Sequence, residues 1–422
     1  EKNLQFSEDP LPVFHSLQKK YSSGLVTVPT VGAGTVNTEF EILTGMRQHD
    51  FGVSEYPYKT VLKSKTSESI CTDLKKLGYS THAVHNNEAT FYGRNTVFSN
   101  IGFDTFCSME YMNGLTDSPN GWSNDDVLSR EIMKTLDSTS GPDFTMAITV
   151  QSHGKYDGIA LDDPTIKVTG APEGKEQAYE YYVNEIHEVD RMIDTLIKEL
   201  SNRKEETVLV LYGDHLPSLD IQKDDLSNAN LYQTQYVVWD NMNLKKKTKN
   251  LHAYQLYAEV LDRIQIHEGM ITKYHQQTKH RSKLYLTGLT TLSYDLLYGD
   301  NYAYDGKNPF KQTELQMGTE PVKLTSVQKT KSGYRVVGSG FTPYCKVYYD
   351  GTLVESEWIS SECLQLQDEF ELDEADKKDS GEPETEVTEP RDVPNAFVVE
   401  VQSDDGVVLS STQAYPASQV KK

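Results

Sequence analysis

Residues 205–217 read EETVLVLYGDHLP, and this stretch indicates the fold class. The apolar run Val208–Tyr212 is too short for a helix and matches a strand that is buried on both faces. Gly213, Asp214 and His215 follow the run at once. Ligands of open α/β sheets bind beyond the carboxyl ends of the strands. We therefore predict a strand of an α/β sheet that carries an acid–imidazole pair at its carboxyl end.

Three further short apolar runs extend this pattern along the chain. They are Leu25–Val31 in SGLVTVPTVG, Ser80–Val84 in GYSTHAVHNN and Phe144–Val150 in PDFTMAITVQSHGKY. An amphipathic helix is predicted before Val208 by apolar residues at steps of three and four, namely Tyr182, Ile186, Val189, Ile193 and Ile197. This alternation of strands and helices through roughly the first 300 residues predicts an α/β fold with a mainly parallel sheet flanked by helices.

The pattern changes near residues 312–321, where the helix signals end. Residues 325–354 alternate apolar and polar side chains between tight Gly turns, which predicts strands. We expect an α/β domain over residues 1–312 and a β-sandwich over residues 315–418. Residues 368–393 are acidic, contain Pro and are poor in aromatic residues, so we expect a mobile loop inserted within the sandwich.

The composition describes a globular and acidic chain. Of its 422 residues, 37% are hydrophobic and 25% are charged, which suffices for a sizeable core. The formal net charge of −22 argues against a nucleic-acid partner, because phosphate backbones are bound by clustered Lys and Arg. A bound divalent cation can still reverse the field that a phosphate-bearing ligand feels. The charge balance therefore favours a metal at any phosphate site.

Two features bear on the cellular compartment. No run of about 18 apolar residues occurs, and the chain opens at Glu1 without a targeting pattern. We therefore expect a partial or processed segment whose membrane anchor lies upstream. The four cysteines show no CxxC spacing, so we expect unpaired thiols, with a Cys345–Cys363 disulfide as the alternative in an oxidising compartment.

All four apolar runs are followed by residue types with catalytic chemistry. These residues are Thr35 after the first run, His85 after the second, His153 after the third, and Asp214 with His215 after the fourth. The carboxyl ends of parallel strands meet at one edge of a sheet. We therefore expect these side chains to form one shared site.

Thr35 lies in GAGTVNTEFEILTGM, just before a predicted helix over residues 37–46. The amino end of a helix presents free backbone N–H groups and a positive dipole to an anionic substrate. A Thr hydroxyl is a weak nucleophile, and it needs a base or a metal to activate it. We interpret Thr35 as the candidate nucleophile, with a turn or N-cap role as the alternative.

The other polar residues suggest a metal and a phosphate. Asp214 and His215 offer one hard oxygen and one imidazole nitrogen, a mixture that suits Mn²⁺ or Zn²⁺ better than Ca²⁺. His153 could ligate a metal, donate to a phosphate oxygen or cap a loop. In HNNEATFYGRN, residues 85–95, Arg94 suits bidentate phosphate binding, and a surface salt bridge is its alternative role.

In this order and spacing, the motifs resemble those of the lipoteichoic acid synthase and phosphoglycerol transferase family, a branch of the sulfatase-like, alkaline-phosphatase-type enzymes. The resemblance is in GAGTVNTEFEILTG, HNNEATFYGRN, QSHGKY and YGDHLP, and it covers roughly residues 1–300. The later segments VVGSGFTPYCKVYYDGTLVESEWISSECLQL and VVLSSTQAY resemble an immunoglobulin-like IPT/TIG module.

This resemblance implies an extracytoplasmic domain that is membrane-associated in the full-length protein. It implies transfer of glycerol phosphate from a phosphatidylglycerol-type lipid to a threonine, and then to a glycerol-phosphate or glycan acceptor. Thr35 would be the nucleophile and a metal ligand, with Asp214 and His215 on the same Mn²⁺, for which Mg²⁺ or Zn²⁺ are alternatives. The headgroup pocket would be lined by His85, Asn87, Tyr92, Arg94 and His153, with His153 or His85 as the acid or base.

The sequence departs from the family pattern in two places. Asn87 and Tyr92 stand where lipoteichoic acid synthases commonly carry Asp and Trp, which bears on the identity of the transferred group. The family's metal site also takes a Glu at the end of the first core strand. Residues 2–24 resemble the segment that follows that strand, so we expect the strand and its Glu to lie upstream.

Other functions remain open at this point. A true sulfatase needs a CxPxR or SxPxR motif, and the sequence contains neither. A metal-dependent phosphodiesterase or phosphatase is an alternative, because chemistry at Thr35 can end on water. A non-catalytic envelope-binding protein with an incomplete metal site is a second alternative.

Overall fold

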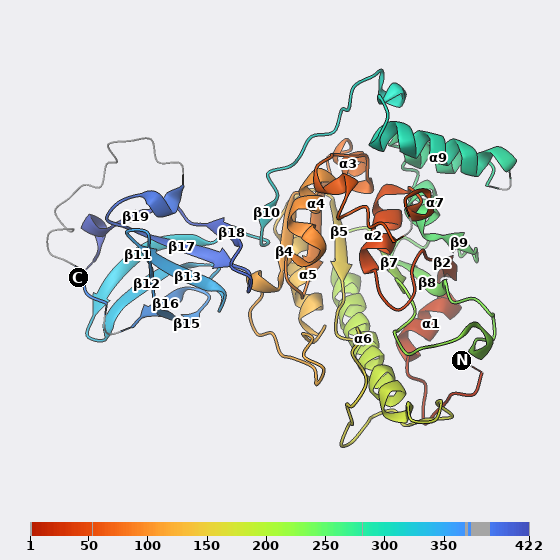
Figure 1. Cartoon of the computed structure of the whole chain (residues 1–422), viewed down its shortest axis with the longest axis horizontal. Helices are drawn as coiled ribbons and strands as arrows, with labels where there is room; N and C mark the ends of the chain where they lie inside the picture. Colours follow the sequence, from red (N-terminus) through yellow and green to blue (C-terminus); the bar gives the residue numbers. More distant parts are fainter. Residues whose placement is uncertain (1, 53, 281, 368–369, 373–388, 422) are drawn as a thin grey trace.

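The computed structural model describes residues 2–52, 54–280, 282–367, 370–372 and 389–421. Figure 1 shows an α/β domain with an all-β module at its side. Beside its two main sheets the α/β domain has a small antiparallel pair, β1 (Gln5–Phe6) with β6 (Val168–Thr169).

The first main sheet consists of four parallel strands in the order β10-β4-β3-β5. Their bounds are Gln316–Met317 for β10, Thr105–Ser108 for β4, Ser80–His85 for β3 and Asp143–Ile148 for β5. β3 lies inside the sheet, and it is buried from Thr81 to His85, as expected for a strand that is covered on both faces.

The second main sheet has the order β7-β8-β2-β9. Its strands are Val208–Tyr212 for β7, Gln233–Asp240 for β8, Ser22–Thr27 for β2 and Leu251–His252 for β9. β8 is antiparallel to both of its neighbours, and β9 is parallel to β2. The predicted α/β fold with mainly parallel strands is confirmed, and β8 is the strand of these two sheets that runs the other way.

The helices pack around these sheets. They are α1 (Pro12–Lys20), α2 (Thr35–Thr44), α3 (Ile70–Lys75), α4 (Arg94–Asn100), α5 (Val127–Asp137), α6 (Glu176–Asn202), α7 (Ala253–Arg263), α8 (Met270–Gln277) and α9 (Lys283–Leu297). α5 packs on β3, β5 and α6, while α7 packs on β2 and α2. α6 confirms the predicted amphipathic helix, and α9 lies at the periphery of the domain (Figure 1). No helix within the described ranges is both long and apolar enough to cross a membrane.

A cavity of about 970 Å³ lies between the two main sheets. Its walls include both edge strands, β5 and β7, together with apolar side chains of α5, α6 and α7. All five residues of β7 are only partly buried, although they are apolar or aromatic. The cavity extends to Thr35, Asp214 and His215, which lie on its lining.

The C-terminal module consists of two antiparallel sheets. One has the order β11-β12-β16-β15, and the other is β14-β13-β17-β18 with β19 also on β17. The strands are β11 (Lys323–Thr330), β12 (Gly333–Ser339), β13 (Cys345–Tyr349), β14 (Thr352–Val354), β15 (Ser356–Ser360), β16 (Cys363–Leu366), β17 (Ala396–Gln402), β18 (Val408–Ser411) and β19 (Tyr415–Pro416). This arrangement is compatible with the predicted β-sandwich.

The module contacts the α/β domain through polar groups. Tyr111 Oη lies 2.7 Å from Ser410 Oγ, and Thr342 Oγ1 donates to the carbonyl of Glu110 at 2.6 Å. The boundary that we predicted at residues 312–315 falls before β10, which pairs with β4 of the α/β sheet. The module strands therefore start only at β11.

Several predicted boundaries were displaced by one turn or a few residues. The run Leu25–Val31 was predicted as a strand, but β2 ends at Thr27, ahead of Pro29, which has no N–H for a sheet. The helix predicted over residues 37–46 instead spans Thr35–Thr44 and stops at Gly45, whose φ of 69° is left-handed.

The structure also bears on the predictions about the cysteines and the acidic segment. All four cysteines are free, so the alternative Cys345–Cys363 disulfide is not formed. Residues 368–369 and 373–388 of the predicted acidic loop lie outside the described residues. At the described edge of this segment, the ring of Phe370 packs against Tyr334, Tyr349 and Phe397.

The carboxyl of Glu41, inside α2, makes the stability of the fold pH-dependent. Burial raises the pKa of Glu41 to about 8 from its ordinary 4.5. Because the folded-state pKa is the higher one, the stabilisation is complete below the unfolded value and is lost as pH rises through about 8. Over that window the difference is on the order of 4 kcal/mol.

We therefore expect Glu41→Gln to flatten the decline of the unfolding free energy between pH 5 and pH 9. Urea unfolding at both pH values measures this decline. Glu8→Gln is the control, since Glu8 is an exposed residue near the amino end. An equal decline in Glu41→Gln and the unaltered protein would show that Glu41 stays ionised in the fold.

Candidate active site

Thr35 is the first residue of α2, where it follows a left-handed glycine. Gly34 has a φ of 96°, and a Cβ at this position would lie 2.8 Å from Thr30 Oγ1. Glycine is therefore required both by the backbone conformation and by the close approach of Thr30. The turn places the Thr35 side chain at the amino end of a ten-residue helix, where backbone N–H groups and the dipole favour an anion.

Asp214 and His215 follow β7 and reach the same place. His215 Nε2 lies 3.3 Å from Thr35 Oγ1, and Asp214 Oδ2 lies 3.3 Å from the same nitrogen. Thr38, one turn along α2, donates its hydroxyl to the carbonyl of Asp214 at 2.7 Å. Three side chains that are up to 180 residues apart in the chain thus form one cluster.

Three histidines at this edge have the same hydrogen-bond arrangement. Nδ1 of His85 donates to the carbonyl of Ile148, Nδ1 of His153 to that of Gly154, and Nδ1 of His215 to that of Leu216, all at 2.8 to 2.9 Å. A carbonyl only accepts, so in each neutral ring Nδ1 carries the proton and Nε2 keeps its lone pair. The site therefore presents imidazole nitrogens that are suited to accept a proton or to ligate a metal.

The histidine rings are close to one another. The ring centroids of His153 and His215 are 6.2 Å apart. Burial, together with the nearby charges of Arg94 and His153, holds the pKa of His85 well below its ordinary value. His85 is therefore neutral in the folded protein across the physiological range.

The donor set of the cluster fits a divalent cation. With Nδ1 protonated, His215 Nε2 and Asp214 Oδ2 are two acceptors that face each other at 3.3 Å without a proton between them. Ligand atoms that share one Mn²⁺ or Zn²⁺ at bond lengths of roughly 2.0 to 2.2 Å lie about 3 to 3.5 Å apart. Within the described ranges, however, no three His, Cys, Asp or Glu side chains form a group that could hold a metal ion, so the set consists of two such residues and the Thr35 hydroxyl.

Arg94 does not present a free guanidinium to the site. It is almost fully buried at the start of α4, and its Nε and Nη2 donate to the two carboxylate oxygens of Glu39 at 3.2 and 2.6 Å. Glu39 is one turn beyond Thr35 on α2. We expected the guanidinium on a phosphate or in a surface salt bridge, but it forms a buried ion pair with Glu39, one helical turn from the candidate nucleophile Thr35.

Tyr92 lies between Arg94 and a second tyrosine. Its ring stacks on Tyr56 with centroids 6.0 Å apart, and the Arg94 guanidinium carbon lies 5.4 Å from the Tyr92 centroid. Tyr92 has a φ of 61°, which is an outlier for a bulky residue and is typically kept where a site requires it. Asn87 is buried after β3, and its carbonyl accepts the N–H of Met109.

Sequence reasoning missed several residues that surround the cluster. Trp122 Nε1 donates to the carbonyl of Gly154 at 2.8 Å, and its ring meets His153 edge-on at 5.3 Å. Asn120 Nδ2 donates to the carbonyl of His153 at 2.9 Å. Both residues lie on the long connection between β4 and α5, and β4 was not among the predicted strands, so their position relative to the strands gave no signal.

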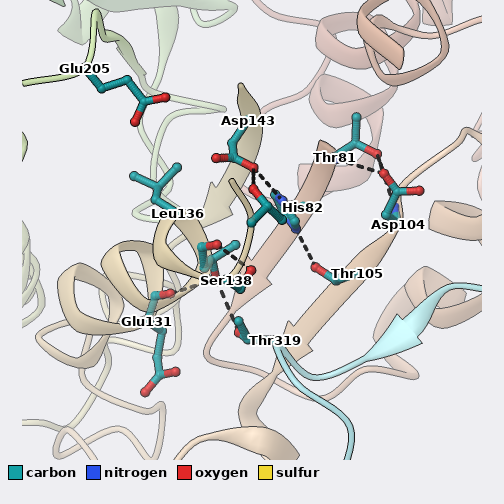
Figure 2. A network of polar contacts seen from close by, with 12 residues as sticks. Thr81, His82, Asp104, Thr105, Glu131, Leu136, Ser138, Asp143, Glu205 and Thr319 are labelled. Atoms are coloured by element: carbon teal, nitrogen blue, oxygen red, sulfur yellow. Dashed lines mark hydrogen bonds and ion pairs between the residues drawn. The ribbon is translucent and has the colours of Figure 1, made fainter. Parts of the chain in front are cut away.

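A second polar network, shown in Figure 2, lies at the other end of the same strands. His82 bonds through Nε2 to Asp143 Oδ1 at 3.1 Å and through Nδ1 to Thr105 Oγ1 at 2.8 Å. Thr105 and Asp143 begin β4 and β5, whereas His85 is the last residue of β3 and His153 follows the carboxyl end of β5. This network therefore joins three strands and is separate from the candidate site.

Comparison with known proteins agrees with this architecture. A sulfatase family profile matches residues 1–266. A Rhizobium meliloti (strain 1021) protein provisionally assigned to cyclic β-1,2-glucan modification is 30% identical over 262 residues, 58% of this chain and 40% of its own length. Lipoteichoic acid synthase 2 of Bacillus subtilis (strain 168) is 24% identical over 199 residues, 46% of this chain and 30% of its own.

Two solved structures share the fold. Streptococcus pyogenes phosphoglycerol transferase GacH, in complex with sn-glycerol-1-phosphate, gives a TM-score of 0.61 at 22% identity and covers 74% of this chain and 85% of that chain. Lipoteichoic acid synthase LtaP of Listeria monocytogenes gives 0.51 at 18% identity, over 64% and 71%. The chain spans less than half of the length of the two curated relatives above. The chain belongs to the sulfatase family.

Proposed function

We propose that this chain carries the metal-dependent transfer of a phosphoglycerol group from a phospholipid headgroup, through a phosphothreonine at Thr35, to a glycerol or glycan acceptor of the cell envelope. The observation that carries the proposal is the 3.3 Å approach of His215 Nε2 to Thr35 Oγ1, with Asp214 beside it at the amino end of α2. A hydroxyl, an imidazole and a carboxylate at an anion-favouring helix end are the parts that phosphoryl transfer requires.

Thr35, Asp214 and His215 would hold the cation, with Mn²⁺ proposed and Mg²⁺ or Zn²⁺ as alternatives. A cation bound there lowers the pKa of the hydroxyl and screens charge on the phosphoryl oxygens. The family resemblance adds a Glu from a further strand. The cavity between β5 and β7 ends at this cluster, so a strand lying there would bring such a carboxylate to it.

The remaining steps of the transfer are assigned to residues of the chain. Thr35 Oγ1 attacks the phosphorus of the headgroup, its hydroxyl proton passes to Nε2 of His153 or His85, and that imidazole then gives the proton to the leaving glyceride oxygen. The helix end and the neighbouring imidazoles hold the phosphate oxygens. An acceptor hydroxyl then attacks the phosphothreonine, and the Thr35 hydroxyl is restored.

Two alternatives lead to different products. If water is the acceptor, the chain is a phosphodiesterase or phosphatase that uses the same residues. If no adduct forms on Thr35, the domain is a binding protein of the envelope. For the transferase we propose an extracytoplasmic location at a membrane surface, because the donor is a lipid.

The test is the detection of the adduct in the full-length protein. After incubation with phosphatidylglycerol vesicles and Mn²⁺, peptide mass spectrometry should find glycerol phosphate on Thr35. Chelation should abolish the adduct, and Mn²⁺ should restore it. Asp214→Asn should lower metal affinity 10-fold or more, roughly the loss that follows removal of one charged ligand.

Asp220→Asn is the control, since Asp220 lies on the same loop and pairs with Lys175 in an exposed bridge. It should leave the metal titration unchanged. An adduct that forms equally well in chelator would remove the metal from the proposal. The absence of any adduct, with metal bound, would favour the binding protein.

A further inference from the structure

An exposed lysine and three aromatic rings lie beside the candidate nucleophile. We call Tyr56, Lys59, Phe91 and Tyr92 the lysine–aromatic patch. The Tyr56 hydroxyl lies 3.4 Å from the position that a Cβ on Gly34 would occupy, so the patch borders the residue before Thr35. Tyr92 connects it to the ion pair of Arg94 beneath the site.

Lys59 forms no salt bridge with an acidic residue in the part of the chain that the structure describes. Its ammonium lies 5.2 Å from the Tyr56 centroid and 5.0 Å from the Tyr92 centroid. Among the described residues, no carboxylate approaches it within 4.0 Å, although the chain has a net charge of −22. Cation–π contacts hold the ammonium in place and leave its N–H donors available. These donors are suited to an anionic group of a ligand.

Phe91 is an exposed aromatic residue that packs on Tyr92, the ring that Lys59 also contacts. Its side chain is 40% exposed, and its ring meets Tyr92 edge-on with centroids 4.6 Å apart. A partly exposed aromatic ring is suited to pack against the apolar C–H face of a sugar ring. The left-handed backbone of Tyr92 holds the two rings in this arrangement.

We propose that the lysine–aromatic patch is the acceptor subsite, and that it binds an anionic sugar with the ring on Phe91 and the phosphate or carboxylate on Lys59. This inference rests on the proposed function and gives the acceptor its chemical class. According to this inference, the subsite prefers a charged glycan to water, to a neutral sugar and to glycerol phosphate, which has no ring.

The transfer step balances with the groups present. A primary hydroxyl oxygen of the sugar forms a bond to the phosphorus of the phosphothreonine, and the bond from phosphorus to Thr35 Oγ1 breaks. The hydroxyl proton passes to an imidazole Nε2 of the site, His153 or His85, and that imidazole returns the proton to the departing Thr35 oxygen. The products are the sugar phosphodiester and the free threonine.

Four small acceptors separate the contributions of the ring and the charge. They are glycerol, glycerol 3-phosphate, methyl β-glucoside and glucose 1-phosphate, each with a primary hydroxyl. We expect glucose 1-phosphate to bind most tightly in ligand-observed NMR titrations of the full-length protein, and to have a kcat/KM about tenfold above each single-feature compound, the size of one charge-assisted contact.

Substitutions then assign each feature to its residue. Lys59→Gln should weaken the binding of glucose 1-phosphate about tenfold. It should affect the binding of methyl β-glucoside much less, because this compound carries no anionic group. Phe91→Ala should weaken the binding of both sugars more than it weakens the binding of glycerol 3-phosphate. Lys63→Gln and Phe6→Ala are matched controls, since Lys63 is an exposed lysine on the next turn and Phe6 is 41% exposed on β1.

Binding and the Thr35 adduct are measured separately, so the two proposals can fail separately. If glycerol 3-phosphate binds as well as glucose 1-phosphate, or if Lys59→Gln behaves like Lys63→Gln, the subsite is wrong even when Thr35 is modified. If the sugars bind as expected but no adduct forms, the patch stands as a glycan site and the transferase is wrong.

Discussion

Replacing Thr35 with alanine is expected to abolish phosphoglycerol transfer, with a loss of at least roughly 10³-fold in kcat and no adduct on the protein. The hydroxyl oxygen of Thr35 would form the covalent bond to phosphorus, and it lies 3.3 Å from His215 Nε2. Thr35 is the first residue of α2, and it directly follows Gly34, whose backbone is left-handed. Transfer of labelled glycerol phosphate from vesicles measures the loss, and circular dichroism verifies the fold.

Two companion variants make this result specific. Thr35→Ser keeps a hydroxyl, and it should keep an adduct at a reduced rate. Thr60→Ala removes an exposed hydroxyl that donates to Glu55 and should behave like the unaltered protein. Retention of the adduct in Thr35→Ala would place the nucleophile elsewhere and would remove the basis of the proposed reaction.

Replacing Glu39 with alanine is expected to lower the free energy of unfolding by about 3 to 5 kcal/mol, the range for breaking one partner of a buried ion pair. The side chains of Arg94 and Glu39 are 1% and 2% exposed, and they form two hydrogen bonds. Burial alone would lower the pKa of Arg94, but Glu39 holds it above its ordinary value. Without Glu39, the guanidinium would stay charged and unpaired in the interior.

Urea unfolding measures this loss, and a surface pair provides the control. Glu188 and Arg191 on α6 form a similar contact at 2.9 Å but are 43% and 67% exposed. Glu188→Ala should therefore change stability by less than about 1 kcal/mol. Glu39→Gln, which keeps an acceptor for Arg94, should fall between the two. A change below about 1 kcal/mol in Glu39→Ala would mean that water reaches the guanidinium.

Four strands of the α/β domain could be predicted because each is a short apolar run with a clear end. β7 matches its predicted bounds, and β3 and β5 differ from theirs by one or two residues. β2 was displaced because Pro29 ends the pairing, although the apolar run continues to Val31. Apolar periodicity therefore locates strands well, and backbone donors decide where they stop.

The role of Arg94 could not be predicted from its own neighbourhood. Its sequence context suggested a loop residue open to phosphate, yet its partner Glu39 is 55 positions away on another helix. The lysine–aromatic patch was missed for the same reason, since Tyr56 and Lys59 come from a turn and Phe91 from a different segment. Contacts between loops depend on how the helices that carry them are packed.

The sequence by itself determined the fold class and the residue types at the carboxyl ends of the strands, because side-chain periodicity and strand length are local properties of the chain. Only the tertiary structure decided which of those side chains meet. It brought Thr35 to Asp214 and His215, and it turned Arg94 away to Glu39. The physical reason is that a buried charge must find a partner wherever the packing supplies one, and this requirement acts across any distance in sequence.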